Sequence, residues 1–420
     1  MVCVRSGFVA ALTPARWLAM SCMALASVAS AQSSAWPAKG GDKAFGGFEP
    51  ILHLRTYDLD QESLTGVPSS AWALGGWAGV RSPWFGDIFQ VGVVGYTSLK
   101  LYGPADKDGT LLLAPGQETI AVLGEAFGSL RFFGQTFTGY RQRINRPFIN
   151  IQDSRMVPNT FEAYTLSGEG SNVSYTGGYI TKMKKRNSEH FVWMSEAAGG
   201  SGEHKGTAFA GVTWDFDKNG YVRGDFQQSI DVFNTFYADG KYPIALDADT
   251  LLALGAQYIN QRSVGAEQLG SFSTWGVGLQ ATIARGPFGG QLYYTQTGKG
   301  FDTQSPYGDH ASYLNLMQVA FNTAGEQAWG IGGTIDFAGL GAPGLTTGIV
   351  YANGRKRINA TTGAAIPDRD ETDVRAEYAF AKGTMLEGLV ATLKYSWLRQ
   401  DGSPQTATQL RAYINYDVRF

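Results

Sequence analysis

Apolar and polar residues alternate with a period of two in one segment after another along this chain. The alternation is clearest in residues 409–420, where Leu410 and Ile414 share one face. Arg411 and Asp417 lie on the opposite face of the same segment. This period is typical of a β-strand between two unlike environments. An apolar face, a polar face and an aromatic end are typical of the closing strand of a transmembrane barrel, and an edge strand of a soluble β-sandwich is the alternative.

The same alternation predicts eighteen strands, which together make one antiparallel transmembrane β-barrel over residues 48–420. The predicted strands are 51–57, 70–80, 89–101, 119–127, 130–135, 160–166, 173–181, 208–216, 221–232, 251–261, 272–284, 289–297, 313–321, 328–337, 345–355, 371–380, 389–398 and 409–420. Short and long connections alternate over most of the chain, as in barrels with short periplasmic turns and long outer loops. The alternation of short and long connections fails between residues 251 and 327, which indicates that one predicted strand in this region is misplaced.

Composition favours the barrel over a helical membrane protein. The chain has 55 glycines among 420 residues and 13% aromatic residues, which suits short strands and turns. Outside the amino-terminal segment, no apolar run is long enough for a membrane-spanning helix. A backbone in lipid must satisfy all its hydrogen bonds internally, so a chain of this kind can span a membrane only as a closed barrel.

The first 31 residues have the features of a secretory signal peptide. Arg5 and Arg16 provide positive charge, residues 17–28 form an apolar run, and Ala29-Ser30-Ala31 matches a cleavage site. A helical anchor is the alternative, although the apolar run is short. Residues 32–47 form a short leader without periodicity. Both cysteines of the chain lie in the signal segment, so the mature protein is expected to contain no disulfide and no thiolate site.

Charge and motif content argue against nucleic-acid binding and against catalysis. Removal of the signal segment would leave 32 basic and 36 acidic residues, a formal charge of about −4. The four histidines, His53, His190, His204 and His310, show no metal-ligand spacing. We therefore expect no metal, no cofactor and no enzyme activity. An outer-membrane hydrolase would need a catalytic pair carried on loops, and the sequence shows none.

Inward-facing cations on the last three predicted strands are the first candidate for function. The alternation places Arg375 inside together with Glu371, Asp373 and Glu377. It also places Lys394, Arg411 and Arg419 inside the barrel on the two following strands. A column of cations along a narrow channel attracts anions, and the planar guanidinium binds carboxylates in particular. The alternative is that these charges are simply solvated or paired with the inward acids.

The long connection 136–159 is the second candidate. It is rich in arginine and contains one acid, Asp153. Its aromatic and basic residues are Tyr140, Arg141, Arg143, Arg146 and Arg155. Folded into the lumen, such a loop would form a constriction, whereas the alternative is an exposed surface loop.

Two groups of motifs resemble the OprD family of substrate-specific outer-membrane porins. The first is Arg131–Gly134 with Asn145-Arg146-Pro147 and Ser154–Thr160. The second, more specific group is Phe321-Asn322-x-x-Gly325-Glu326-x-x-Trp329 followed by Asp336–Thr346. The resemblance implies an eighteen-stranded barrel, a third loop folded inward and a ladder of basic residues along the wall. The ladder positions that it implies are Arg131, Arg375, Lys394 and Arg411.

The resemblance also implies passive uptake of small nutrients, mostly carboxylate-bearing ones. Residues 182–207 and 356–370 depart from the family pattern, which leaves the substrate open. We therefore expect a bacterial outer-membrane porin for small anionic solutes, in contact with outer-membrane lipid and present as a monomer or homotrimer. The alternative from another class is a closed-lumen barrel that acts as an adhesin or a structural protein.

Overall fold

A computed structural model describes residues 46–418. The predicted signal peptide, most of the leader and Arg419 lie outside the described residues. The strands are β1 (Glu49–Glu62), β2 (Pro68–Arg81), β3 (Phe89–Tyr102), β4 (Ile120–Phe132), β5 (Gln135–Gln142), β6 (Thr160–Glu169), β7 (Val173–Lys184), β8 (Phe191–Trp193), β9 (Thr207–Asp217), β10 (Gly220–Ser229), β11 (Phe233–Ala245), β12 (Thr250–Ser263), β13 (Ser273–Arg285), β14 (Phe288–Thr297), β15 (Gln327–Asp336), β16 (Leu345–Arg355), β17 (Arg369–Ala379), β18 (Leu389–Gln400) and β19 (Ala407–Val418). Short helical turns are η2 (Ala105–Lys107), α2 (Met194–Ala197) and η3 (Ala338–Leu340).

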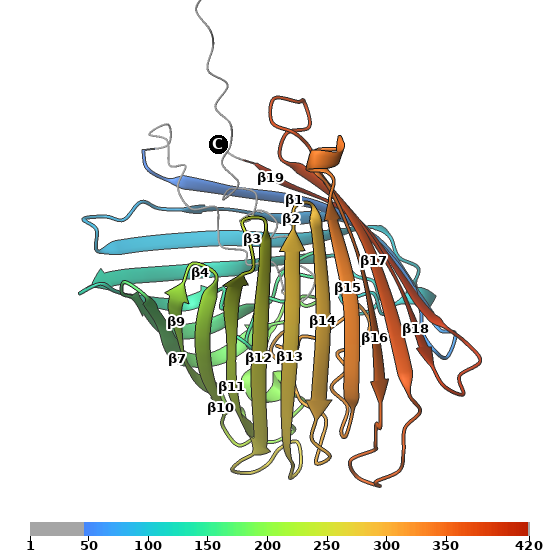
Figure 1. Ribbon diagram of the computed structural model, residues 1–420. Coiled ribbons are helices and arrows are strands. Elements are labelled where there is room, and N and C mark those ends of the chain that lie inside the picture. Colours follow the sequence, from blue (N-terminus) through green and yellow to red (C-terminus); the bar gives the residue numbers. More distant parts are fainter. Residues whose placement is uncertain (1–45, 419–420) are drawn as a thin grey trace, which may run out of the picture.

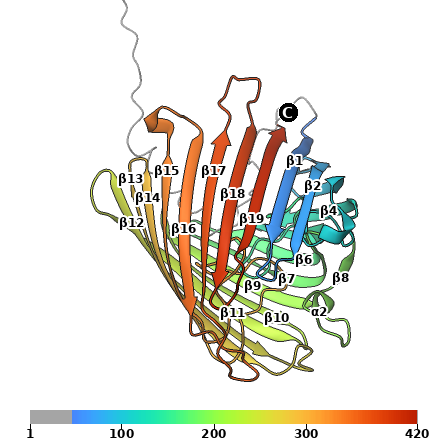
Figure 2. The ribbon, with the colours of Figure 1, turned by 90° about the vertical axis from the view of Figure 1, so that its right-hand side faces the viewer.

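The strands form one antiparallel barrel in which each strand pairs with its neighbours in sequence (Figure 1). The three-residue β8 pairs with the end of β7, and β7 also pairs directly with β9, so eighteen strands circle the barrel. The barrel closes where β1 pairs with β19 over residues 52–62 of β1, and Figure 2 shows these two strands side by side. The predicted fold class, an eighteen-stranded antiparallel barrel, is confirmed.

The alternation in the sequence becomes two faces of the barrel wall. On β13, for example, the outward Leu279 and Ile283 are exposed, whereas Thr274 and Thr282 on the other face are buried. Large exposed apolar side chains repeat in this way around the sheet, which gives the apolar outer band that lipid requires. Among the described residues, no helix has the length and apolar character needed to cross a membrane.

Three strand predictions were wrong in detail. The structure contains β11, which the sequence analysis missed, and residues 313–321, predicted as a strand, belong to the connection 298–326. The predicted strand 130–135 instead contains the end of β4, a tight turn at Phe133-Gly134 and the first residue of β5. With these corrections, long and short connections alternate again through residues 251–327. The misplaced strand expected there is therefore 313–321.

Long connections gather at one end of the barrel, which we call the outer end because short turns of such barrels are periplasmic. Three of them matter here: loop 3 (residues 143–159), loop 4 (185–206) and loop 7 (298–326). Side chains of loops 3 and 7 are fully buried, among them Ile149, Ile151 and Leu314. Ile149 of loop 3 also forms a backbone bridge with Tyr307 of loop 7. These loops therefore pack together inside the barrel, and the alternative of an exposed loop 3 is wrong.

Candidate functional site

Loop 3 is tied to two nearly opposite walls of the barrel by ion pairs. Near its end, Asp153 accepts hydrogen bonds from Nη1 (2.7 Å) and Nη2 (3.2 Å) of Arg55 on β1. Near its beginning, Arg146 donates through Nε and Nη2 to Asp225 on β10, at 2.7 and 2.8 Å. Burial would raise the pKa of the Asp153 carboxyl, but the charge and hydrogen bonds of Arg55 hold it below its usual value. Loop 3 therefore crosses the lumen as a fixed partition.

Two of the four predicted constriction residues lie in a strand rather than in the loop. Tyr140 and Arg141 lie within β5, so the prediction that they belong to the loop is wrong. Strand β5 directly follows the turn at Phe133-Gly134, which makes it resemble the start of a loop in the sequence. In the structure, it pairs with both β4 and β6. Arg141 pairs with Glu162 at 3.1 Å. Arg143 does lie in loop 3, but its Nε donates to Glu125 of β4 at 2.8 Å and its guanidinium lies over Trp77.

The tip of loop 7 is held by two carboxylates of β17. Both oxygens of Glu371 accept backbone N–H groups, from Gln318 at 2.7 Å and Val319 at 3.0 Å. Asp373 accepts the backbone N–H of Met317 at 2.9 Å. On the next strand but one, Arg411 Nη2 donates to the Met317 carbonyl at 2.7 Å. Two of the inward acids that the alternation placed beside the cations, Glu371 and Asp373, thus bind a loop backbone.

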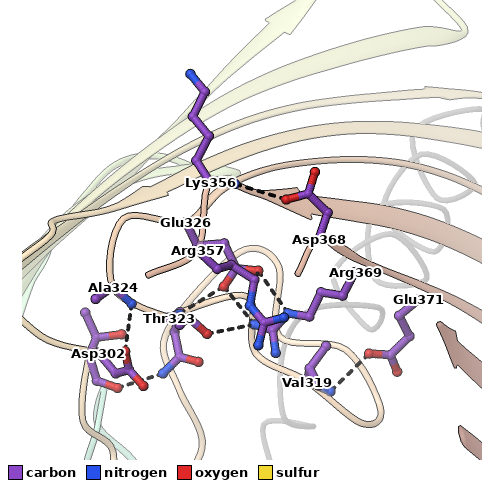
Figure 3. Close-up of polar contacts among 12 residues, drawn as sticks. Asp302, Val319, Thr323, Ala324, Glu326, Lys356, Arg357, Asp368, Arg369 and Glu371 are labelled. Carbon is purple, nitrogen blue, oxygen red and sulfur yellow. Dashed lines mark hydrogen bonds and ion pairs between the residues drawn. The ribbon is translucent and has the colours of Figure 1, made fainter. Parts of the chain in front are cut away.

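The base of loop 7 is held by a buried ion pair, which Figure 3 shows together with its neighbours. Glu326, at the end of the loop, is fully buried and accepts from Nε (2.9 Å) and Nη2 (2.7 Å) of Arg369 on β17. It also accepts the backbone N–H of Thr323 at 2.9 Å. Asp302, in the first part of the loop, accepts the backbone N–H of Ala324 at 2.7 Å. Loop 7 is therefore fixed at both its base and its tip.

Three of the predicted wall cations stand in one row. Arg375 of β17 is the direct cross-strand partner of Lys394 on β18, and Lys394 is that of Arg411 on β19. Neighbouring strands lie about 4.8 Å apart, so the row extends about 10 Å along the wall. Arg131 is elsewhere, near the short-turn end of β4, where its guanidinium lies 4.0 Å from the centre of the Trp84 ring. Arg419 lies outside the described residues.

A cavity of about 390 Å³ opens beside this row, between the wall and the tips of loops 3, 4 and 7. Its lining contains six cations and four carboxylates. The cations are Arg55, Arg155, Arg186, Arg375, Lys394 and Arg411, and the carboxylates are Asp153, Asp309, Asp373 and Glu377. Tyr140, Arg141, Arg143 and Arg146 are absent from this lining. The structure thus brings together the row of β17–β19 and, of the loop cations named from the sequence, only Arg155.

Sequence reasoning missed two contributors to the cavity and undervalued a third. Arg55 lies on the inward face of an alternating strand, so the alternation alone could have identified it as a residue that faces the lumen. Arg186 follows two lysines at the start of a long connection, a basic run that indicates a charged site but not its location. Arg155 was noted in the loop, yet nothing in the sequence distinguishes it from the arginines that pair with distant acids.

Comparisons with known proteins agree with this architecture. Residues 54–420 match the model of the outer membrane porin, OprD family. Porin D of Pseudomonas aeruginosa is 24% identical over 288 residues, a match that spans 64% of this chain and 64% of that protein. The chain thus matches slightly less than two thirds of the length of this curated relative.

Solved porin structures share the fold at low sequence identity. OccK9 (OpdG) of Pseudomonas aeruginosa superposes with a TM-score of 0.80 at 20% identity, covering 88% of this chain and 98% of that one. OccAB3 of Acinetobacter baumannii superposes with a TM-score of 0.82 at 17% identity, covering 89% of this chain and 100% of that one. OpdK of Pseudomonas aeruginosa, solved with vanillate, gives 0.77 at 19% identity, covering 88% and 98%. These proteins are channels rather than enzymes, and the chain belongs to the OprD family of outer-membrane porins.

Proposed function

We propose that this outer-membrane porin passes small anionic, carboxylate-bearing solutes by diffusion past a basic wall. The observation that carries the proposal is the row formed by Arg375, Lys394 and Arg411 beside the cavity. Of the acids in the lining, Asp153 pairs with Arg55, and Asp373 interacts with Lys394 and Arg411 of the row. The lining as a whole still has six cations against four carboxylates. In a narrow channel walled by protein, such an excess of positive charge raises the local concentration of anions.

The lining supports a carboxylate as the solute group in particular. A guanidinium binds a carboxylate with two parallel hydrogen bonds, and five of the six lining cations are arginines. Vanillate, found in the OpdK structure, is itself a carboxylate. No bond between solute and protein is made or broken, so selectivity arises from the pore width and the placement of charge. Whether the protein is a monomer or a homotrimer stays a prediction.

Replacing Arg375, Lys394 and Arg411 together with glutamine is expected to lower the permeability ratio of chloride to potassium severalfold. The change removes three positive charges from the wall and leaves shorter, polar side chains in their place, so the field that favours anions is weakened. The measurement is the reversal potential of single channels in a planar bilayer under a KCl gradient.

A matched control removes three positive charges from exposed positions near strand ends. Arg262, Arg285 and Arg355 are exposed and do not line the cavity. Their replacement with glutamine is expected to leave the reversal potential close to that of the unmodified protein. An unchanged reversal potential in the wall variant would contradict the proposed role of the row.

A further inference from the structure

Three arginines converge on the cavity without a carboxylate partner of their own. In the described part of the chain, no salt bridge within 4 Å involves Arg155 of loop 3, Arg186 of loop 4 or Arg411 of β19. Arg155 instead donates to the carbonyls of Thr110 (2.7 Å) and Ser154 (2.8 Å). Arg186 donates to the hydroxyl of Ser154. Arg411 donates to the Gln409 side chain and the Met317 carbonyl, both at 2.7 Å. We call these three residues the arginine cluster.

The arginine cluster is costly for the protein as long as no anion is present. Arg155 exposes only 7% of its surface, and removing a charge from water without a counter-ion is unfavourable. Burial lowers the pKa of both Arg155 and Arg186, and the charge of Arg411 lowers the pKa of each further. The carboxylate of Asp309 on loop 7 opposes this effect and raises the pKa of both arginines in part. An anion bound at the cluster would offset this unfavourable electrostatic energy.

Arg411 belongs both to the arginine cluster and to the wall row. Arg375 and Lys394 continue from it along the wall, so a second set of cations begins about 5 Å away and ends about 10 Å away at Arg375. The whole lining carries two more cations than carboxylates. A solute with one negative charge would leave part of this excess unbalanced, whereas a solute with two separated negative charges would balance it.

We propose that the cavity is a binding site for a small dicarboxylate, with one carboxylate at Arg155, Arg186 and Arg411 and the other at Lys394 and Arg375. The proposal rests on the anion preference proposed above and adds a substrate class to it. Guanidinium groups from two different loops contact the first carboxylate, so binding also requires loops 3 and 4 in their observed positions. A dicarboxylate is then expected to dwell in the pore and interrupt the chloride current, whereas a monocarboxylate passes quickly.

Block of the single-channel chloride current tests this site. The probes are succinate and butyrate, which share a carbon chain and differ in the second carboxylate. The expected half-blocking concentration of succinate is lower than that of butyrate by about tenfold or more, the usual effect of a charge-assisted hydrogen bond. Inorganic phosphate, whose oxygens surround one centre and reach only one end of the site, is the third probe and is expected to block less than succinate. Equal block by phosphate and succinate would contradict the two-point geometry.

Variants locate the site. Replacing Arg155 and Arg186 with glutamine is expected to raise the half-blocking concentration of succinate to the value for butyrate, while Arg375 and Lys394 keep the channel anion-selective. Replacing both with lysine keeps the charge but loses the planar fork, so an intermediate value is expected. Arg285→Gln removes one exposed charge outside the cavity lining and should leave the block by succinate unchanged. The single Arg186→Gln variant, which loses only a contact with Ser154, serves if the double variant does not fold.

The outcomes separate this proposal from the proposed function. An anion-selective channel that succinate and butyrate block equally would overturn the dicarboxylate site and leave the proposed function intact. A channel without anion selectivity would overturn the proposed function itself. Succinate block that persists in the Arg155 and Arg186 variants would refute the arginine cluster as its location.

Discussion

Replacing Glu326 with leucine is expected to release the base of loop 7 while the barrel remains closed. The change leaves the Arg369 guanidinium buried without a counter-charge and leaves the Thr323 N–H without its acceptor. Removing one partner of a buried ion pair costs about 3–5 kcal/mol. The cost falls on the loop, because β15 and β17 are held in the barrel by complete strand pairing. Limited proteolysis from the outer face should therefore cut residues 298–326 in the variant and not in the unmodified protein.

A double replacement provides the matched control. Glu326→Leu combined with Arg369→Met removes both members of the close ion pair, and apolar side chains of similar volume often replace such a pair with little loss. Arg357, which lies 3.9 Å from Glu326, keeps its hydrogen bonds to Pro367 and Gln400. The double variant is expected to recover most of the protection of loop 7 from protease. Equal protection of the single variant and the unmodified protein would show that the ion pair does not hold the loop.

Replacing Glu371 with glutamine and Asp373 with asparagine is expected to detach the tip of loop 7 and to widen the pore. The two carboxylates accept three backbone N–H groups, and an amide offers one oxygen where a carboxylate offers two. Each charge-assisted hydrogen bond contributes about 1.5–3 kcal/mol, so their loss makes a detached loop a populated state. The expected result is a larger and noisier single-channel conductance and faster entry of larger solutes in liposome swelling.

The Glu371→Gln, Asp373→Asn variant also separates the size limit of the pore from its charge selectivity. It replaces carboxylates and no cation, so anion selectivity is expected to stay or increase while the size limit rises. Glu377→Gln is the control on the same face of β17, because Glu377 lines the cavity and accepts a long hydrogen bond of 3.4 Å from Thr392 rather than a backbone N–H of loop 7. The same conductance and size limit in the double variant and the unmodified protein would contradict the role of these carboxylates as a clamp for loop 7.

Strands with lipid on one face and water on the other were predictable from sequence, and the exceptions have one physical cause. Strand β11 was missed because its inner face packs against loop 3, where Phe148 contacts Tyr237, so both faces contain aromatic residues. Its Asp239-Gly240 pair also resembles a turn, although Asp239 accepts hydrogen bonds from Arg223 across the sheet. Residues 313–321 alternate like a strand because loop 7 is itself buried in the lumen.

The residues of the site were predictable only where the alternation along a strand determines which side chains face the lumen. Arg375, Lys394 and Arg411 were placed inside by alternation, and the register of three strands makes them neighbours. The loop arginines could not be sorted in this way. Arg146 finds Asp225 and Arg143 finds Glu125 on strands far away in the sequence, whereas Arg155 finds only carbonyl groups. Which arginine keeps its charge available depends on these tertiary contacts, which no local pattern contains.

The most direct test of an anion-selective pore is the reversal potential of the unmodified protein, measured as single channels in a planar bilayer under a KCl gradient. We expect discrete channel currents and a reversal potential displaced toward the equilibrium potential of chloride, because cations exceed carboxylates in the cavity lining. A reversal potential displaced toward that of potassium would contradict the proposed anion preference. The absence of channel currents would contradict an open pore and favour a barrel with a closed lumen.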